Sequence, residues 1–165
     1  MYKNILQILF RHFGTIQSAR ETDVEQLFYL SNDQTVRRYS LNHKKIKWES
    51  HMRWFKERLS NNNYVIYIIE LFGYFIGQVR FKIDRSRREA VISVSLTSKA
   101  RGLGLSSLVI QKALLLFRRY HVPIIKAYIL KDNVISEKSF QRAGFIYDKS
   151  TCMKNQKVKI FIKNI

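Results

Sequence analysis

The segment from Val91 to Leu108 constrains the fold of this chain more than any other stretch of its sequence. Its first part, Val91–Leu96, alternates in the period of two that is typical of a β-strand. A turn, Arg101-Gly102-Leu103-Gly104, follows, and a helical pattern begins near Leu105. A strand, a glycine turn and a helix start bring backbone N–H groups and the positive end of a helix dipole to one point. We therefore expect an anion-binding site at this turn.

The length of 165 residues predicts one domain, residues 1–165, and a hydrophobic content of 46% is typical of a packed globule. The chain has a single cysteine, Cys152, which excludes an internal disulfide, and one thiol is too few for a structural zinc site. We therefore expect no metal, and a reducing, cytoplasmic setting. No apolar run approaches the roughly 20 residues that a membrane span needs.

The charge is strongly positive, because 30 Lys and Arg residues stand against 12 Asp and Glu residues, a net charge of +18. Such a field attracts polyanions. The basic residues are scattered, however, and neither aromatic interleaving nor helix-turn-helix or zinc-finger spacing accompanies them. The pattern argues against a nucleic-acid role and favours a small polyanion as partner.

Hydrophobic periodicity predicts helices and strands along the whole chain. Residues 3–13 fit either a surface helix or a distorted first strand. A capping box of Thr22 and Glu25 predicts a helix that runs to Ser31, and residues 36–45 are expected to form a loop over a binding cleft. Further helices are expected at 47–59, 105–120 and 133–143, and strands at 15–19, 64–71, 74–83, 89–97 and 124–130, with a closing hairpin of 145–148 and 158–162. This order predicts an α+β fold with a mixed central β-sheet flanked by helices.

The residues after Gly104 exclude two common phosphate loops. A Walker A loop needs Gly-Lys-Ser/Thr, whereas Leu105 follows Gly104, and a dinucleotide fingerprint needs a third glycine where Ser107 stands. The sequence Arg-x-x-Gly-x-Ser of residues 101–106 instead resembles the Gln/Arg-x-x-Gly-x-Gly/Ala signature of the GNAT N-acetyltransferases. A second motif of that family, Asn-x-x-Ser-x-x-x-Phe-x-x-x-Gly-Phe, matches Asn133, Ser136, Phe140, Gly144 and Phe145.

The resemblance covers roughly residues 15–150 and implies the GNAT acyl-CoA N-acyltransferase fold, with acetyl-CoA as the acetyl donor. In this family the strand before the loop splays from its neighbour and pairs with the pantetheine arm, which here implies Leu96 and Thr97. The loop residues implied to hold the pyrophosphate are Arg101, Gly102, Gly104, Leu105 and Ser106. Asn133, Ser136 and Phe140 are implied to contact the rest of the cofactor, although Asn133 also fits a plain helix N-cap.

Two residues depart from the family pattern. Ser106 replaces a glycine or alanine, and its hydroxyl could either clash with a phosphate oxygen or bind it. Phe140 stands where many members carry the tyrosine that protonates the leaving thiolate. Either another group supplies that proton, or the CoA thiolate leaves without help.

A narrower resemblance concerns the acceptor. Three stretches are similar to GNAT domains of pseudaminic and legionaminic acid biosynthesis. They are Asn32-Asp33 followed by Val36-Arg37 and Ser40, the run Ile46-x-Trp48-x-x-His51-x-x-Trp54-Phe55, and the strand Ile76-Gly77-Gln78-Val79-Arg80-Phe81. This resemblance implies a small-molecule acceptor, the 4-amino group of a UDP-linked amino-dideoxy sugar. It also suggests a hydrolase of that pathway as a partner, and a homodimer remains open.

Direct attack of an amine on a thioester needs a neutral amine, and hence a base or a water-relayed path. The candidates are His51, Glu70 and Ser95, of which His51 has the best pKa for the task, although a helix-surface histidine that is bonded locally is the alternative interpretation. The candidate acceptor-pocket residues are Trp54, Gln78, Arg80 and Ser93, and Trp54 fits the core equally well.

Two other functions remain open from the sequence. The first is acetylation of a protein N-terminus or a small amine; a cationic acceptor of that kind prefers an acidic pocket, which the shortage of Asp and Glu disfavours. The second is a non-catalytic module that binds CoA, nucleic acid or a partner enzyme. Phe140 and the net charge favour this module.

Overall fold

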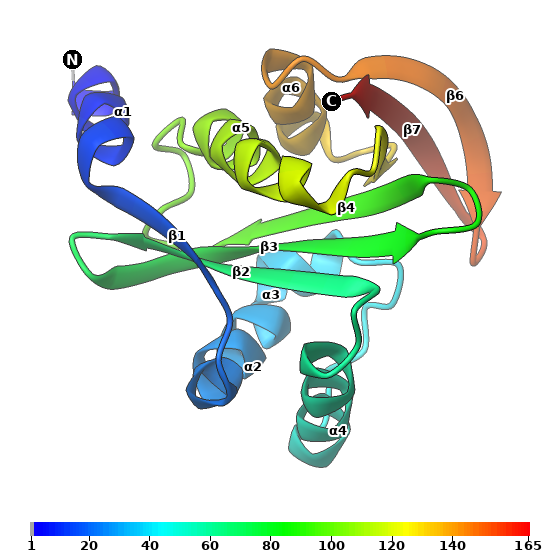
Figure 1. Cartoon of the computed structure of the whole chain (residues 1–165), viewed down its shortest axis with the longest axis horizontal. Coiled ribbons are helices and arrows are strands. Elements are labelled where there is room, and N and C mark those ends of the chain that lie inside the picture. The colour runs from blue at the N-terminus through cyan, green and yellow to red at the C-terminus, as the bar shows by residue number, and fades with distance from the viewer. Residues whose placement is uncertain (1) are drawn as a thin grey trace.

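One seven-stranded mixed sheet organises the chain, and the structure, a computed structural model, describes residues 2–165 of it. In chain order the strands are β1 (Gly14–Ser18), β2 (Tyr64–Leu71), β3 (Tyr74–Asp84), β4 (Glu89–Leu96), β5 (Ile124–Leu130), β6 (Ile146–Met153) and β7 (Gln156–Asn164). They lie side by side in the order β1-β2-β3-β4-β5-β7-β6 (Figure 1). Only β4 and β5 are parallel. The predicted α+β class with a mixed sheet is confirmed.

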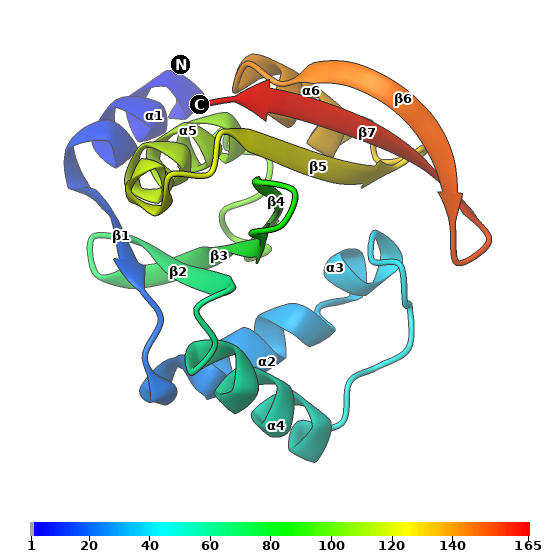
Figure 2. The same cartoon turned by 45° about the vertical axis from the view of Figure 1, so that its right-hand side comes forward.

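Helices cover both faces of this sheet. They are α1 (Tyr2–Phe13), α2 (Val24–Asn32), α3 (Gln34–Arg38), α4 (Trp48–Leu59), α5 (Ser106–Phe117) and α6 (Val134–Arg142), with 3-10 turns at Glu21–Asp23 and Arg118–Tyr120. Figures 1 and 2 show α1, α5 and α6 on one face and α2, α3 and α4 on the other. The central strands are therefore covered on both sides, which explains the continuous apolar run Val65–Ile69 in β2.

The two faces form two apolar clusters because successive side chains of a strand point to opposite sides. On the α5 face, Phe81 of β3 stacks on Phe117 with ring centroids 3.9 Å apart. On the α2–α4 face, Ile66 and Ile68 of β2 pack with Leu27 and Phe55. Burial of such side chains contributes about 1.5–3 kcal/mol each.

The sequence of the N-terminal segment fits either a helix or a strand, and in the structure this segment is helix α1. Phe10 of this helix is fully buried, and Lys112 of α5 binds the C-terminal end of α1. The Lys112 ammonium donates to the carbonyls of Phe10, Arg11 and Gly14 at 3.1, 3.0 and 3.0 Å. These contacts satisfy carbonyl groups that a helix end leaves without partners.

The start of the second helix differs from the prediction. Thr22 and Glu25 form no capping box; the chain makes a 3-10 turn there, and the Asp23 carboxylate accepts the N–H of Arg20 at 2.7 Å. The predicted end at Asn32-Asp33 is confirmed. Asp33 then caps α3 by accepting the N–H groups of Thr35 and Val36, so the expected loop of residues 36–45 is helical in its first part.

The closing hairpin is longer than predicted. Its strands β6 and β7 meet at Lys154-Asn155, which have φ values of 48° and 61°. Both values lie in the left-handed region that two-residue hairpin turns require. Residues 146–152 of β6 are exposed on both sides. This edge strand therefore has no alternation of apolar and polar residues from which its full length could be predicted.

Candidate active site

Strands β4 and β5 part from one another halfway along β4. Their parallel pairing runs only from Glu89 and Ile124 to Ile92 and Ala127, whereas β4 continues to Leu96 and β5 stays paired with β7 to Leu130. The backbone of β4 beyond Ile92 therefore has a strand neighbour on the β3 side alone. The splay that the family resemblance implies is present in this structure.

The backbone groups at the end of β4 do not all face the gap. The Thr97 N–H donates to the Ile76 carbonyl of β3 at 2.9 Å, and the Thr97 carbonyl accepts the N–H groups of Ala100 and Arg101. Because orientation alternates along a strand, Leu96 turns its groups toward the gap. Of the two residues predicted to pair with the pantetheine arm, Leu96 faces the gap, where its carbonyl accepts a hydrogen bond from Arg101, and Thr97 is engaged elsewhere.

The glycine turn has the backbone conformation of an anion site. Gly102 and Gly104 have φ values of 74° and 76°, and a Cβ atom at Gly102 would meet no other atom within 4 Å, so open space lies beside this backbone. Leu105 occupies the N-cap of α5 but forms no side-chain cap. The first amides of α5, including that of Ser106, therefore keep unused donors at the positive helix end.

Arg101 joins the two sides of the gap. Its Nε donates to the Leu96 carbonyl at 2.9 Å, and its Nη2 lies 2.5 Å from Oδ1 of Asp33, the cap of α3. The residue predicted to hold the pyrophosphate is thus in an ion pair with the helix on the opposite face of the sheet.

The second motif lies on α6. Asn133 is the N-cap of this helix, where its Oδ1 accepts the Ser136 N–H at 3.1 Å. Its side-chain amide nitrogen, Nδ2, remains a donor for a ligand. Phe140 is 4% exposed and packs edge-on against Phe145, with centroids 5.0 Å apart. The predicted left-handed Gly144, with φ of 86°, ends the helix.

Four polar residues predicted for catalysis or the acceptor pocket form a row on the α2–α4 face. Gln78 of β3 is paired with Ser95 of β4, and Arg80 is paired with Ser93. Ser93 is exposed, whereas Gln78 is buried and its Oε1 has no hydrogen-bond partner among the described residues. The Arg80 guanidinium lies 5.3 Å from the centre of the Trp54 ring, which links α4 to the row.

The structure places His51 outside this row. Its ring is 2% exposed among the aromatic side chains of α2 and α4, and Nε2 lies 3.1 Å from the Val24 carbonyl, to which it donates. Burial lowers the pKa of His51, the hydrogen bond to Val24 raises it, and the nearby charge of Arg80 lowers it. This placement also differs from the alternative of a helix-surface histidine bonded locally, because the ring is buried and its partner lies on α2. A buried imidazole that donates to a backbone carbonyl is poorly placed to collect a proton from an acceptor amine.

The other carboxylate candidate also lies apart. Glu70 is near the end of β2 and accepts a hydrogen bond from Thr15 of β1 at 3.3 Å. The strand β3 separates β2 from β4, so Glu70 is about 10 Å from the β4 backbone. Of the three predicted catalytic residues, only Ser95 lies beside the gap.

Arg37 of α3 was part of the narrower resemblance but was assigned no role from it. Its Nη2 donates to Ser40 Oγ and its Nη1 to the Asn42 carbonyl, both at 3.1 Å. These contacts hold together the segment after α3, and the spacing of basic residues in the sequence does not reveal them.

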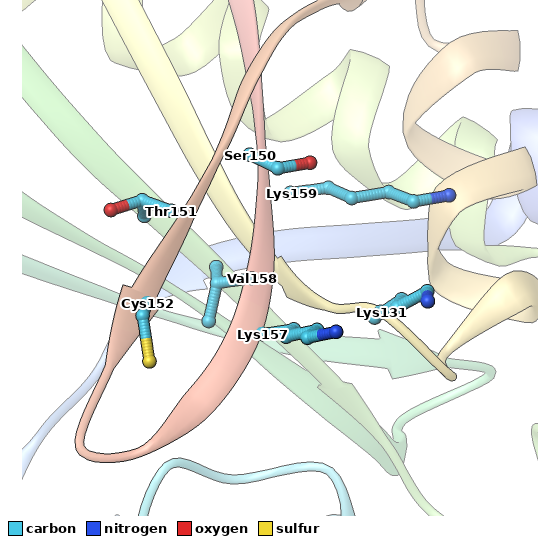
Figure 3. A pocket seen from close by; sticks show the side chains of 7 residues that line it. All are labelled: Lys131, Ser150, Thr151, Cys152, Lys157, Val158 and Lys159. Atoms are coloured by element: carbon cyan, nitrogen blue, oxygen red, sulfur yellow. The ribbon is translucent and has the colours of Figure 1, made fainter.

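A separate pocket of about 370 Å³ opens beside the β6–β7 hairpin (Figure 3). Figure 3 shows Lys157 and Lys159 extending from β7 on the side of Lys131 and α6. Lys159 is paired with Glu137 at 2.8 Å. None of the predicted site residues lines this pocket. Within residues 2–165, no group of three metal-ligating side chains is assembled, and no helix has the length and apolar character of a membrane span.

Comparison with known proteins gives a consistent family. The acetyltransferase (GNAT) domain family matches residues 15–146. Among solved structures, a spermidine N-acetyltransferase from Vibrio cholerae in complex with CoA and spermine has a TM-score of 0.84 at 16% identity, covering 92% of this chain and 95% of that one. A ribosomal L7/L12 alpha-N-protein acetyltransferase in complex with CoA has a TM-score of 0.82 at 16% identity, covering 93% and 95%.

An aminoglycoside acetyltransferase in complex with CoA has a TM-score of 0.79 at 16% identity, covering 92% of this chain and 94% of that one. At such identities the likeness shows the shared fold. No curated protein sequence matches the chain. The family match spans most of the sequence, and the splayed strands and glycine turn agree with it. The chain therefore belongs to the GNAT family of acetyltransferases.

Proposed function

We propose that this GNAT enzyme transfers the acetyl group of acetyl-CoA to a primary amine that approaches from the α2–α4 face. The observation that carries the proposal is the parting of β4 from β5 after Ile92 and Ala127, next to the uncapped start of α5. An extended arm fits beside the free edge of β4, and a diphosphate fits the amides of the glycine turn.

The residues that would hold the donor follow from this placement. The amides of Gly102, Gly104, Leu105 and Ser106 would hold the pyrophosphate, the N–H of Leu96 would pair with the arm, and Asn133 would donate from its side-chain amide nitrogen. When bound, acetyl-CoA supplies the thioester carbon that the amine nitrogen attacks, and the carbon–sulfur bond breaks to release the thiolate. Because Phe140 has no hydroxyl, this chain leaves the thiolate, whose pKa is about 8.5, to depart without that acid.

For the acceptor we propose the 4-amino group of a UDP-linked amino-dideoxy sugar. The polar row of Gln78, Arg80, Ser93 and Ser95 supports a hydroxylated, hydrogen-bonding acceptor. Deprotonation of the amine is assigned to a water-relayed path along the serines, because His51 donates to Val24 and Glu70 lies across β3.

A protein N-terminus is the second candidate acceptor. It is favoured by the fold shared with the ribosomal-protein N-acetyltransferase and by the exposure of Ser93 at the mouth of the row.

The test is release of free thiol from acetyl-CoA in the presence of single acceptors. The panel contains a UDP-4-amino-dideoxy sugar, the same sugar without UDP, a peptide with a free N-terminus, and spermidine. We expect acetyl-CoA to bind in calorimetry and the UDP-sugar to give the highest kcat/KM. Binding of acetyl-CoA without thiol release for any acceptor would instead identify a non-catalytic module.

A further inference from the structure

A pocket of about 530 Å³ opens on the outer side of helices α2 and α4, which pack side by side (Figure 2). Its lining comes from the turn before α2, the first half of α2 and the start of α4: Thr22, Val24, Glu25, Phe28, Tyr29 and Trp48. Leu27 of α2 packs toward the sheet, and Tyr29 lies about 200° around the helix from it. The pocket is therefore on the side of α2 that faces away from the sheet and from the acetyl-transfer gap.

Three aromatic rings form the apolar part of this pocket. The rings of Phe28 and Trp48 are nearly perpendicular, with centroids 5.0 Å apart, and the ring of Tyr29 lies 5.6 Å from that of Phe28. Tyr29 is 65% exposed and Trp48 is 38% exposed. Large aromatic side chains thus leave a corner of ring surface open to a ligand. The faces of such rings carry negative potential and attract cations.

Glu25 places a carboxylate beside these rings. It precedes Phe28 by three residues and Tyr29 by four, so the three side chains are neighbours on the surface of α2. Among residues 2–165, the ion pairs of the protein do not involve Glu25. The lining of the pocket includes no lysine or arginine, although Lys47 precedes Trp48 in the sequence. In a chain with a net charge of +18, this pocket thus has the opposite local charge.

The rings are held in place from the inner side of the helix pair. The buried His51 of α4 donates from Nε2 to the Val24 carbonyl at 3.1 Å, and its ring centroid lies 5.4 Å from that of Phe28. These contacts fix α2 against α4 without any contribution from a ligand. A preformed pocket loses little conformational freedom on binding, and more of the contact energy therefore appears as affinity.

We infer that this pocket binds an organic ammonium ion. Its alkyl groups contact the rings of Phe28, Tyr29 and Trp48, and the carboxylate of Glu25 compensates its charge. An alkylated ammonium suits such a lining better than an inorganic cation, because it combines a positive charge with apolar surface. The pocket shares no lining residue with the predicted acetyl-transfer site. The inference therefore goes beyond the proposed function and does not rest on it.

The experiment measures binding of choline. The neutral control is the carbon analogue of choline, in which a tert-butyl group replaces the trimethylammonium group and the shape is nearly unchanged. Calorimetry on the wild-type protein gives both affinities, and the emission of Trp48 in a Trp54→Phe background reports binding at the pocket itself. Sodium chloride keeps the ionic strength constant, since salt screens exposed charges. We expect choline to bind in the millimolar range and the neutral analogue to bind about tenfold more weakly.

Two pairs of variants compare a lining residue with a matched residue outside the pocket. Glu25→Gln should weaken choline binding about threefold, whereas Glu49→Gln, also in the first turn of its helix, should change it less than about twofold. Tyr29→Leu should weaken choline binding about fivefold, because one ring face is lost. Tyr74→Leu, at an exposed position on β3, should leave it unchanged. All four side chains are exposed, so the fold should tolerate each substitution.

Three results would overturn the inference. Equal affinities for choline and its neutral analogue would show an apolar pocket that does not select a charge. Equal effects of Glu25→Gln and Glu49→Gln would show that choline responds to the overall field of the protein and not to contact in the pocket. The third is an absence of choline binding to the folded wild-type protein. Binding of acetyl-CoA and release of thiol test the proposed function separately, so the failure of one leaves the other standing.

Discussion

Arg101 Nη2 and Asp33 Oδ1 lie 2.5 Å apart, and this ion pair connects the glycine turn on one side of the sheet to the start of α3 on the other. The same guanidinium donates from Nε to the Leu96 carbonyl. A single side chain thus contacts the end of β4, the turn and the helix that carries Arg37. The donor side and the acceptor side of the gap are joined through it.

Replacement of Arg101 tests its expected contact with the pyrophosphate. Arg101→Ala should weaken acetyl-CoA binding about tenfold in calorimetry, because one charge-assisted hydrogen bond is lost. Asp33→Asn is the matched control: asparagine still caps α3, and removal of this half-exposed pair should cost at most about 1 kcal/mol of unfolding free energy. Wild-type affinity in Arg101→Ala would show that the arginine serves the fold alone.

The glycine turn permits a second matched comparison. Gly102 and Gly73 have φ values of 74° and 76°, and an added Cβ meets nothing within 4 Å at either position. Alanine should therefore cost both sites a similar strain of about 1–2 kcal/mol. Only Gly102→Ala should lower the affinity for acetyl-CoA, because its methyl group occupies the approach to the backbone amides. Equal affinities of the two variants for acetyl-CoA would show that the pyrophosphate does not bind at this turn.

His51 should influence stability more than turnover. Its pKa is held low by burial, so the unfolded chain takes up the proton first as the pH falls. The stabilisation is present above the unfolded pKa of about 6.5 and is lost as the pH falls through the lower folded pKa. Wild type should lose unfolding free energy between about pH 7.5 and 5.5, and His51→Gln, which can still donate to Val24, should lose less.

Urea denaturation at the two pH values checks this expectation. His12→Gln, a change at an exposed histidine at the end of α1, should retain the wild-type pH dependence. An undiminished slope in His51→Gln would place the titrating group elsewhere.

Lys112 should be the strongest single attachment of α1. Lys112→Met removes the ammonium that binds the carbonyls of Phe10, Arg11 and Gly14, and it should lower the unfolding free energy by about 1–3 kcal/mol. Proteolytic cleavage within residues 2–13 should become faster. Lys138→Met, at an exposed position on α6, should change neither quantity measurably.

Local patterns were enough to predict most of the fold. The apolar run of β2, the alternation in β4, the cap at Asn133 and the stop at Gly144 depend on neighbours within a few residues, and each is present in the structure. The caps and the stop do not depend on how distant segments pack. The parting of β4 from β5 was implied by the resemblance to the GNAT family and not by local pattern.

Apart from the local capping box of Thr22 and Glu25, the errors concern contacts between distant segments. Asp33 caps α3 and also binds Arg101, a residue far away in the chain. Lys112 belongs to the narrow polar face of its own helix, a pattern that predicts contact with solvent. Its ammonium instead bonds the carbonyls at the C-terminal end of α1. His51 shows the same effect, because its burial between α2 and α4 depends on how the helices pack rather than on its own neighbours in sequence.

The parting of β4 from β5 affects the free energy of unfolding of the protein. A sheet interrupted in its middle keeps backbone donors and acceptors that have no strand partner, so this fold is less stable than a continuous sheet of the same length. A molecule that occupies this place acts thermodynamically as part of the native state, and its free concentration sets the melting temperature by mass action. Resistance to heat and occupancy by substrate are thus two measurements of one equilibrium.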